Sequence, residues 1–346
     1  MRPMSARRES GVVLVVVLVF VLLLASTVAT FLKRAVVDTM IARNRDSGAR
    51  AEALARGGIR LGTVLILEDR LREISGDLGI DASSDLWAKV QGIPIPVEEG
   101  ATLQLHIEDA GDKLNLNAVF QFDPNGDAHE NAAPLLDKLL EKVIEEMPIP
   151  PDERALYDRA ELVANLIDYA DPGDLRQRGG PEDDAYQDRD PPQRPANRPL
   201  LSLDELRVVE GFDALLVEAM RPYLTVHPFA GLLGINPNTA PPHVLALLFF
   251  NDGVEFRLAP EETIRDLLRV RQEGGWICGE GQSDERCTPI SEIMPNANAI
   301  YPPAAFQSDV FVVSADAVVG DVRRSVEAVL DRRSGGRPLL LSWRVL

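Results

Sequence analysis

The chain has 346 residues, of which 45% are hydrophobic and 5% aromatic, so it has room for a membrane anchor and one large or two modest globular domains. Its formal net charge of −18 at pH 7 repels nucleic acid and favours cationic partners or calcium. The composition therefore argues against a nucleic-acid-binding protein.

An uncharged apolar segment begins at Gly11 and continues to Leu32, shortly after Arg7 and Arg8. At 1.5 Å per residue it would form roughly 33 Å of helix, enough to cross a hydrocarbon core of about 30 Å. The arginines predict a cytoplasmic N-terminus by the positive-inside rule. The rest of the chain is therefore expected on the far side of the membrane.

A cleavable secretory signal begins in the same way, and the small residues at 25–29 (ASTVA) would suit its cleavage site. Residues 31–66 favour a retained helix instead, because they contain no proline and are rich in helix formers. Leu54, Leu61 and Leu65 also recur at helical spacing. The segment predicts one helix of about fifty residues, half in the membrane and half beyond it.

Strand patterns occupy two separate parts of the chain. Residues 102–108 (TLQLHIE) alternate apolar and polar side chains, which is typical of a half-buried strand, and residues 93–96 (IPIP) before them indicate a linker or a sheet edge. Further strand patterns occur only near the end, in residues 310–319, 323–330 and 339–345. Turn sequences at 320–321 (GD) and 334–337 (SGGR) separate these three segments, which predicts an antiparallel meander.

The long region between the strands is predicted to be helical. Apolar residues between Leu156 and Ala170 recur every three or four positions, as on one face of a helix. The other helix candidates are residues 135–147, 203–209, 244–250 and 261–272. The sequence therefore predicts an α+β fold, with a long N-terminal transmembrane helix and an antiparallel sheet interrupted by a large helical insertion.

A short basic leader that ends in glycine and is followed at once by an apolar helix resembles the N-terminus of type IV prepilins. The resemblance implies that a prepilin peptidase cleaves between Gly11 and Val12 and that the helix is retained. Val12 replaces the usual aromatic residue or methionine, and Val16 stands where most pilins carry a glutamate. That glutamate is understood to pair with the N-terminal amine of a neighbouring subunit, so its absence predicts a subunit with no such neighbour.

The order of these elements and six short motifs resemble the minor pseudopilin K family of type II secretion systems, which characteristically lacks that glutamate. The motifs are DAGDKLNLN (109–117), LIDYAD (166–171), GPEDDAY (180–186), PANRP (195–199), DELRVVEGF (204–212) and INPNTA (235–240). Each motif alone is weak, but together they follow the family order. The resemblance covers nearly the whole chain.

The resemblance implies the organisation and role of the chain. The expected parts are a cleaved leader (1–11), an N-terminal helix (12–67, of which 12–32 is transmembrane), a pilin-like domain (68–118 and 300–346) and an inserted helical domain (119–299). The implied role is to initiate or cap the pseudopilus at its tip, for protein export across the outer membrane, from a single-pass inner-membrane anchor with the C-terminal domain in the periplasm. The implied partners are minor pseudopilins I and J, the inner-membrane secretion platform, the prepilin peptidase and membrane lipid, with no nucleic acid and no enzymatic activity.

Six carboxylates crowd the end of one predicted helix and the loop after it. They are Asp168, Asp171, Asp174, Glu182, Asp183 and Asp184. Like charges repel, so a bridging cation would stabilise the loop, and calcium accepts roughly six to eight oxygen ligands in irregular loops. The resemblance supports calcium, because the family's helical domain is associated with bound calcium. The alternatives are a solvated acidic loop without metal and a magnesium or two-metal hydrolase site.

Residues 123–127 (DPNGD) look like the opening of a calcium loop, but Pro134 stands where an EF-hand needs its closing glutamate. We therefore interpret them as a turn. Cys278 and Cys287 lie close together in a glycine-rich segment, and their spacing excludes a CxxC metal site. In an oxidising compartment they are predicted to form a disulfide that closes a small surface loop, and two free thiols are the alternative.

Residues 202–212 (SLDELRVVEGF) have the rhythm of a helix-hairpin-helix, with a capping box at Ser202 and Glu205 and a turn at Gly211. DNA-binding hairpins present basic groups to phosphate, whereas this one is surrounded by acidic residues, which favours a structural hairpin. The four histidines, at positions 106, 129, 227 and 243, have no ligand spacing. Two rival functions remain: a membrane-anchored metal-dependent hydrolase that uses the acidic loop, and a DNA-uptake protein that uses the hairpin.

Overall fold

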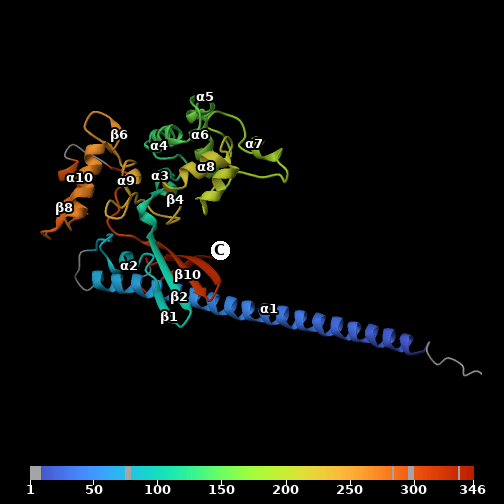
Figure 1. Cartoon of the computed structure of the whole chain (residues 1–346). Coiled ribbons are helices and arrows are strands. Elements are labelled where there is room, and N and C mark those ends of the chain that lie inside the picture. Colours follow the sequence, from blue (N-terminus) through green and yellow to red (C-terminus); the bar gives the residue numbers. More distant parts are fainter. Residues whose placement is uncertain (1–8, 75–78, 283, 295–299, 334–335) are drawn as a thin grey trace, which may run out of the picture.

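The computed structural model describes residues 9–74, 79–282, 284–294, 300–333 and 336–346. Its largest element is α1 (Glu9–Ile74), a helix of 66 residues that projects away from the rest of the molecule (Figure 1). Residues 12–46 of this helix are exposed, and the segment is long and apolar enough to cross a membrane. The helix continues to Ile74, seven residues beyond the predicted end. Residues 1–8, most of the predicted leader, lie outside the described part.

The second half of α1 packs against a five-stranded antiparallel sheet (Figure 1). Its strands, in spatial order, are β1 (Ile95–Glu98), β2 (Ala101–Asp109), β10 (Val310–Val319), β11 (Val322–Asp331) and β12 (Leu339–Val345). The predicted strands and the antiparallel meander are confirmed, and residues 93–96 lead into an edge strand. Gly320 turns the chain between β10 and β11 with φ +58°, a conformation that glycine adopts without strain. Residues 334 and 335 of the second predicted turn are not described.

Small residues bring α1 close to the sheet. Ala51 and Ala55 are fully buried at this contact, and a Cβ on Gly58 would lie 2.7 Å from the Cβ of Ala315. Of the leucines that recur at helical spacing, Leu54 and Leu65 pack against this core, whereas Leu61 is 38% exposed. Alanine and glycine occupy the positions where the helix backbone comes closest to the strands, and Ile59 and Ile66 fill the space beside them.

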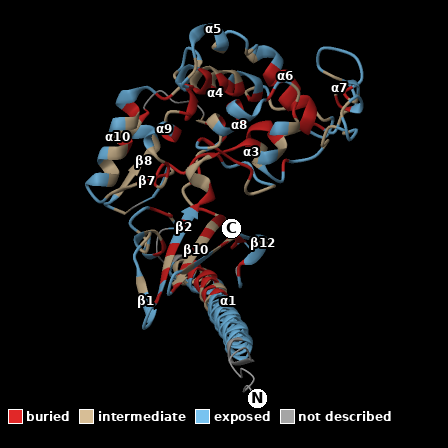
Figure 2. Cartoon of the chain, turned by 45° about the vertical axis from the view of Figure 1, so that its right-hand side comes forward, coloured by how far each residue is buried: buried red, intermediate tan, exposed pale blue. Residues whose placement is uncertain are grey.

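The insertion lies between β2 and β10 and has its own core, as the two separate buried regions in Figure 2 show. Its helices are η1 (Ala110–Asp112), α3 (Leu116–Phe120), α4 (Ala132–Glu146), α5 (Pro151–Arg154), α6 (Arg159–Ala170), α7 (Asp184–Gln187), η2 (Leu203–Val208), α8 (Ala214–Met220), α9 (Pro242–Leu245), α10 (Glu261–Gln272) and α11 (Ile290–Ile293). A short helix before the sheet, α2 (Leu86–Lys89), buries Trp87 against Phe311.

The prediction that strands are absent from the insertion was wrong. Three small sheets form there from β3 (Leu114–Asn115), β4 (Leu224–Thr225), β5 (Phe249–Asn251), β6 (Phe256–Leu258), β7 (Trp276–Cys278), β8 (Cys287–Pro289) and β9 (Ile300–Tyr301). The helix expected at 244–250 ends at Leu245, and its last residues belong to β5 instead. An apolar run this short does not distinguish a buried helix from a buried strand. The helix expected at 203–209 is the 3-10 turn η2.

Candidate functional site

The acidic loop begins at the end of α6. The backbone N–H of Asp171 donates to the carbonyl of Ile167 (2.9 Å) and closes the helix, and the chain then turns at Pro172 and Gly173. A bridge between Leu175 and Pro181 returns the chain to the helix end. This return places a glutamate from the far end of the loop beside the last turn of α6.

Three of the six predicted carboxylates meet at this point. Asp168, Asp171 and Glu182 each offer an oxygen atom within 4.8 Å of the other two, and all three residues are buried. Asp168 accepts from the backbone N–H of Gln177 (3.2 Å), and Asp171 accepts from that of Gly173 (2.7 Å). Neither carboxylate oxygen of Glu182 has a hydrogen-bond partner among the described residues.

The electrostatics of the cluster disfavour three negative charges. Burial, and then the charges of Asp171 and Asp168, raise the pKa of Glu182 from 4.5 to about 7. Burial also raises the pKa of Asp168 and of Asp171. A buried carboxylate without a donor carries a desolvation cost that only a proton or a cation removes.

The residues fit a small hard cation. A cavity of about 10 Å³ lies against Asp168 and Glu182, close to the volume that one water molecule or ion needs. Arg176, which also lines it, pairs with Glu210 (3.1 Å). Carboxylate oxygens are ligands that calcium prefers, and the two oxygens of Glu182 without a hydrogen-bond partner supply two of them.

The other three predicted ligands lie outside this group. Asp174 and Asp184 are exposed, and the carboxylate of Asp183 accepts from the side-chain amide of Gln187 (3.3 Å). The crowding in sequence did not distinguish them from the residues that meet, because the bridge at the base of the loop decides which side chains face α6.

Sequence reasoning separated the turn at residues 123–127 from the acidic loop, but the structure brings them together. A Cβ on Gly126 would lie 3.0 Å from Pro172, and the charge of Asp127 contributes to raising the pKa of Asp171. Asp123 accepts from the backbone N–H groups of Asn125 (2.8 Å) and Asp127 (3.0 Å), so its own oxygens hold the turn together. The interpretation of DPNGD as a turn is confirmed, but nothing in the sequence indicated that this turn lies beside the acidic loop.

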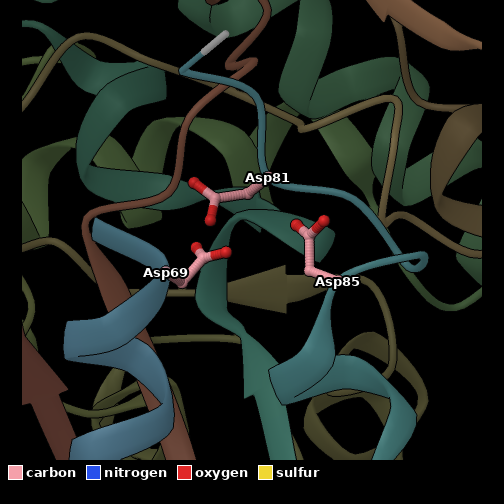
Figure 3. A group of neighbouring side chains, drawn as sticks. All are labelled: Asp69, Asp81 and Asp85. Carbon is pink, nitrogen blue, oxygen red and sulfur yellow. The ribbon is translucent and has the colours of Figure 1, made fainter. Parts of the chain in front are cut away.

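A second acidic group, Asp69, Asp81 and Asp85, lies where α1, the chain before α2 and the sheet meet (Figure 3). An arginine supplies the positive charge here: Arg332 pairs with Asp69 (3.0 Å) and with Asp81, and its own side chain is only 2% exposed. Arg332 also donates to the carbonyl of Ser308 (2.7 Å). We therefore assign this group to a structural junction, because a guanidinium already bridges two of its carboxylates.

The INPNTA motif ties the insertion to the sheet. The fully buried Asn236 donates from its side chain to Asp109 at the end of β2 (3.0 Å), and the hydroxyl of Thr239 donates to the same carboxylate (2.6 Å). Asn238 exchanges two hydrogen bonds with the backbone of Ile277 (2.8 Å each). These side chains satisfy buried backbone groups, so the motif has a structural role.

The asparagines of the DAGDKLNLN motif hold distant segments of the insertion together. The side chain of Asn115 donates to the carbonyl of Pro228 (2.9 Å). The side chain of Asn117 donates to the carbonyls of Leu200 (2.9 Å) and Val226 (2.8 Å) and accepts from the N–H of Leu200 (2.8 Å). Two of the short sequence motifs are thus hydrogen-bonding elements of the core.

Cys278 and Cys287 form a disulfide, with their Cα atoms 5.9 Å apart. They lie on the paired parallel strands β7 and β8, beside the contact between Asn238 and Ile277. The bridge therefore closes a loop next to the junction between insertion and sheet.

The hairpin at residues 202–212 has the predicted capping box. The Ser202 side chain accepts from a backbone N–H of the first turn, and the Glu205 side chain accepts from the backbone N–H of Ser202. Arg221, on the helix side of the hairpin, pairs with Asp204 (2.7 Å) and Glu218 (3.2 Å), so its charge is already balanced. Neither acidic group found among the described residues contains a histidine or a cysteine. Within the described residues, Arg207 and Arg221 beside the hairpin are thus paired with carboxylates, which disfavours a phosphate-binding role there.

Similar proteins agree with this architecture. A family model described as type II secretion system (T2SS), protein K, matches residues 112–229, which hold both the acidic loop and the hairpin. A type II secretion system protein K from Aeromonas hydrophila is 27% identical over 349 residues, with 97% of each chain covered. The chain is therefore similar to type II secretion system protein K along nearly its whole length. The protein K of Klebsiella pneumoniae is 29% identical over 247 residues, covering 71% of this chain and 70% of the relative.

The protein K fold is also known from a solved structure. A chain in the crystal structure of the GspK-GspI-GspJ complex from enterotoxigenic Escherichia coli superposes with a TM-score of 0.61. The match covers 88% of this chain and 99% of that chain at 18% sequence identity. At this identity the likeness supports the fold, which confirms the prediction of a long helix, an antiparallel sheet and a large insertion.

Proposed function

We propose that this chain, as a minor pseudopilin of a type II secretion system, occupies the tip of the pseudopilus and initiates or caps its assembly. The observation that carries the tip position is Val16, an exposed apolar residue where most pilins carry the glutamate that pairs with the next subunit's amine. A filament subunit without that glutamate cannot pair with the N-terminal amine of a next subunit, as expected for a subunit at the tip. The large insertion at the end of the molecule away from the N-terminus of α1 supports the same position (Figure 1).

The anchor defines the orientation that this role needs. The first part of α1 crosses the inner membrane, and the sheet and insertion lie in the periplasm, where a disulfide such as Cys278–Cys287 persists. The leader is removed by the prepilin peptidase between Gly11 and Val12. The chain acts through assembly with pseudopilins I and J and the inner-membrane platform, and it catalyses no reaction.

Co-purification from membranes tests the proposal. The full chain, tagged at its C-terminus and expressed with its neighbouring pseudopilins, should retain pseudopilins I and J after mild detergent extraction. Deletion of the chain should stop protein export, and re-expression should restore it. A chain that copurifies with neither pseudopilin, or whose deletion leaves export unchanged, would refute the tip role.

We further propose that calcium binds at Asp168, Asp171 and Glu182 and holds the acidic loop against α6. The support is the orphaned, buried carboxylate of Glu182 and the raised pKa values around it. Binding to the folded state alone would stabilise it by roughly 2.7 kcal/mol at free calcium 100 times the dissociation constant.

Metal analysis and thermal unfolding test the calcium site. The melting temperature should rise in millimolar calcium, respond less to magnesium and fall with a chelator. Asp171→Ala should remove this response, whereas Asp184→Ala, an exposed carboxylate outside the group, should keep it. Absence of bound calcium together with indifference to the chelator would leave only a solvated acidic loop.

A further inference from the structure

The helix-side face of the sheet is incompletely covered. In the ladder between β11 and β12, Ala328 pairs with Trp343 and Leu330 with Leu340, so the side chains of each pair project from the same face. Ala328 and Leu330 are buried in the core beneath α1. Trp343 is 38% exposed and Leu340 49%, because α1 packs mainly over β2, β10 and β11 and leaves β12 partly uncovered.

This uncovered strip forms one side of a cavity of about 310 Å³, here called the α1–β12 groove. Its lining residues are Arg56, Ile59, Arg60, Thr63, Leu330, Arg337, Pro338, Leu340 and Trp343. Ile59 and Leu330 are buried and give the groove an apolar floor. The arginines lie at its rim, and all three are exposed.

The charge of the groove is opposite to that of the chain as a whole. Arg56 pairs with Glu52 (2.6 Å) and lies over the ring of Trp343 (5.9 Å). Arg60 and Arg337 have no ion-pair partner among the described residues, in a chain whose net charge is −18. Two unpaired guanidinium groups beside a half-exposed tryptophan favour an occupant that brings both carboxylates and an apolar side chain.

Membrane lipid does not fit this place. Arg56 follows Leu32, the last residue of the apolar run, by 24 residues. At 1.5 Å per residue this puts it about 36 Å along the helix from the membrane, beyond the reach of lipid headgroups. The occupant must come from the periplasmic part of another protein.

We propose that the α1–β12 groove receives a carboxylate-bearing helix of a neighbouring pseudopilin. Such a helix would lie on the sheet beside α1 and extend the helical layer over β12, covering Leu340 and Trp343. Its carboxylates would pair with Arg60 and Arg337, and an apolar side chain would fill the floor over Ile59. The inference rests on the proposed role as a filament subunit and names the surface through which that role is performed.

Charge reversal in the full-length, membrane-anchored chain tests the groove. In co-purification, the double variant Arg60→Glu, Arg337→Glu should retain about one tenth or less of the neighbouring pseudopilin that the wild-type chain retains, because two attractive pairs become repulsive. Trp343→Ala should weaken retention through lost apolar contact. The control is Arg265→Glu, which reverses an exposed arginine on α10 that likewise lacks an ion-pair partner among the described residues, and it should retain the wild-type amount.

A photo-crosslinker at Thr63, which lines the groove, identifies the occupant. The expected adduct is a peptide of a pseudopilin helix that contains an aspartate or glutamate, and matching lysine substitutions there should restore binding to the reversed variant. An adduct to a second copy of this chain, or to a segment without carboxylates, overturns the inference. Wild-type and reversed chains retaining equal amounts of partner also overturn it, while a wild-type chain that retains no pseudopilin overturns the proposed function itself.

Discussion

Glu182 is a buried carboxylate whose oxygens have no donor within the described chain, and its pKa is raised to about 7 from 4.5. Without metal, at a pH between these two values, the Glu182 carboxyl is therefore protonated in the folded state and ionised in the unfolded state. The contribution of Glu182 to stability is largest below about pH 4.5 and is lost as the pH rises toward 7, because the unfolded state binds fewer protons than the folded state there. Calcium replaces the proton, so it should oppose this loss and bind more tightly as the pH rises.

The prediction is a pH series of melting temperatures in chelator. The wild-type chain should lose stability between pH 4.5 and 7, and Glu182→Gln should flatten this part of the curve and abolish the calcium response. Asp184→Asn serves as the control and should keep both. An equal slope for Glu182→Gln and wild type would show that this carboxylate does not titrate in the window.

Arg332 is the buried cation of the junction between α1 and the sheet, paired with Asp69 and Asp81. Arg332→Met keeps much of the volume but removes the positive charge, and it should cost about 3 to 5 kcal/mol of unfolding free energy. Arg344→Met, which breaks a pair with Glu327 at the sheet surface, should cost less than about 1 kcal/mol. Denaturant unfolding of the detergent-solubilised chain measures both, and equal costs would contradict a special role for the buried arginine.

At the scale of elements, the contact of α1 with the sheet requires glycine at position 58 but not at the neighbouring position 57. A Cβ on Gly58 would meet the Cβ of Ala315 at 2.7 Å, whereas a Cβ on Gly57 has open space. Gly58→Ala should therefore destabilise the chain by about 1 to 3 kcal/mol through overpacking. Gly57→Ala should be neutral or stabilise it by up to about 1 kcal/mol, because alanine favours helix.

The same unfolding measurement compares these two adjacent variants. Their helix propensities change identically, so the difference between them isolates the approach of α1 to β10. A Gly58→Ala chain as stable as Gly57→Ala would mean that the helix moves away from the sheet at little cost.

At the scale of the whole molecule, the proposed role requires that the leader be removed while the apolar helix is retained as the anchor. We expect cleavage between Gly11 and Val12, because the leader meets the apolar run there. N-terminal sequencing of the mature protein should start at Val12. Gly11→Leu should retain the leader and stop assembly with the other pseudopilins.

An ordinary secretory signal gives a different result for the same protein. Its mature chain would begin near Thr30 and would lack most of the apolar helix. That outcome would contradict both the processing site and the anchored filament role. Retention of the full helix with export lost in Gly11→Leu would support them together.

The sequence by itself determined the features that repeat locally along the chain. The apolar run predicted a helix long enough to cross a membrane, and period-two alternation predicted β2. Strand patterns separated by turn sequences predicted the three closing strands, and the spacing of Cys278 and Cys287 suited the loop that they close. The capping box at Ser202 was also readable, because its hydrogen bonds span only a few residues. Local hydrogen bonding and burial produce periodic sequence patterns, which can be recognised without knowing the rest of the fold.

Only the tertiary structure decided which distant groups meet. Six carboxylates close in sequence became a group of three, because the Leu175–Pro181 bridge turns Glu182 toward α6. The partners of Arg332 come from α1 and the chain after it, more than two hundred residues away. The α1–β12 groove forms where α1 lies beside β12, the edge strand of the sheet. Such contacts depend on how the whole chain packs, so no short segment of sequence is sufficient to predict them.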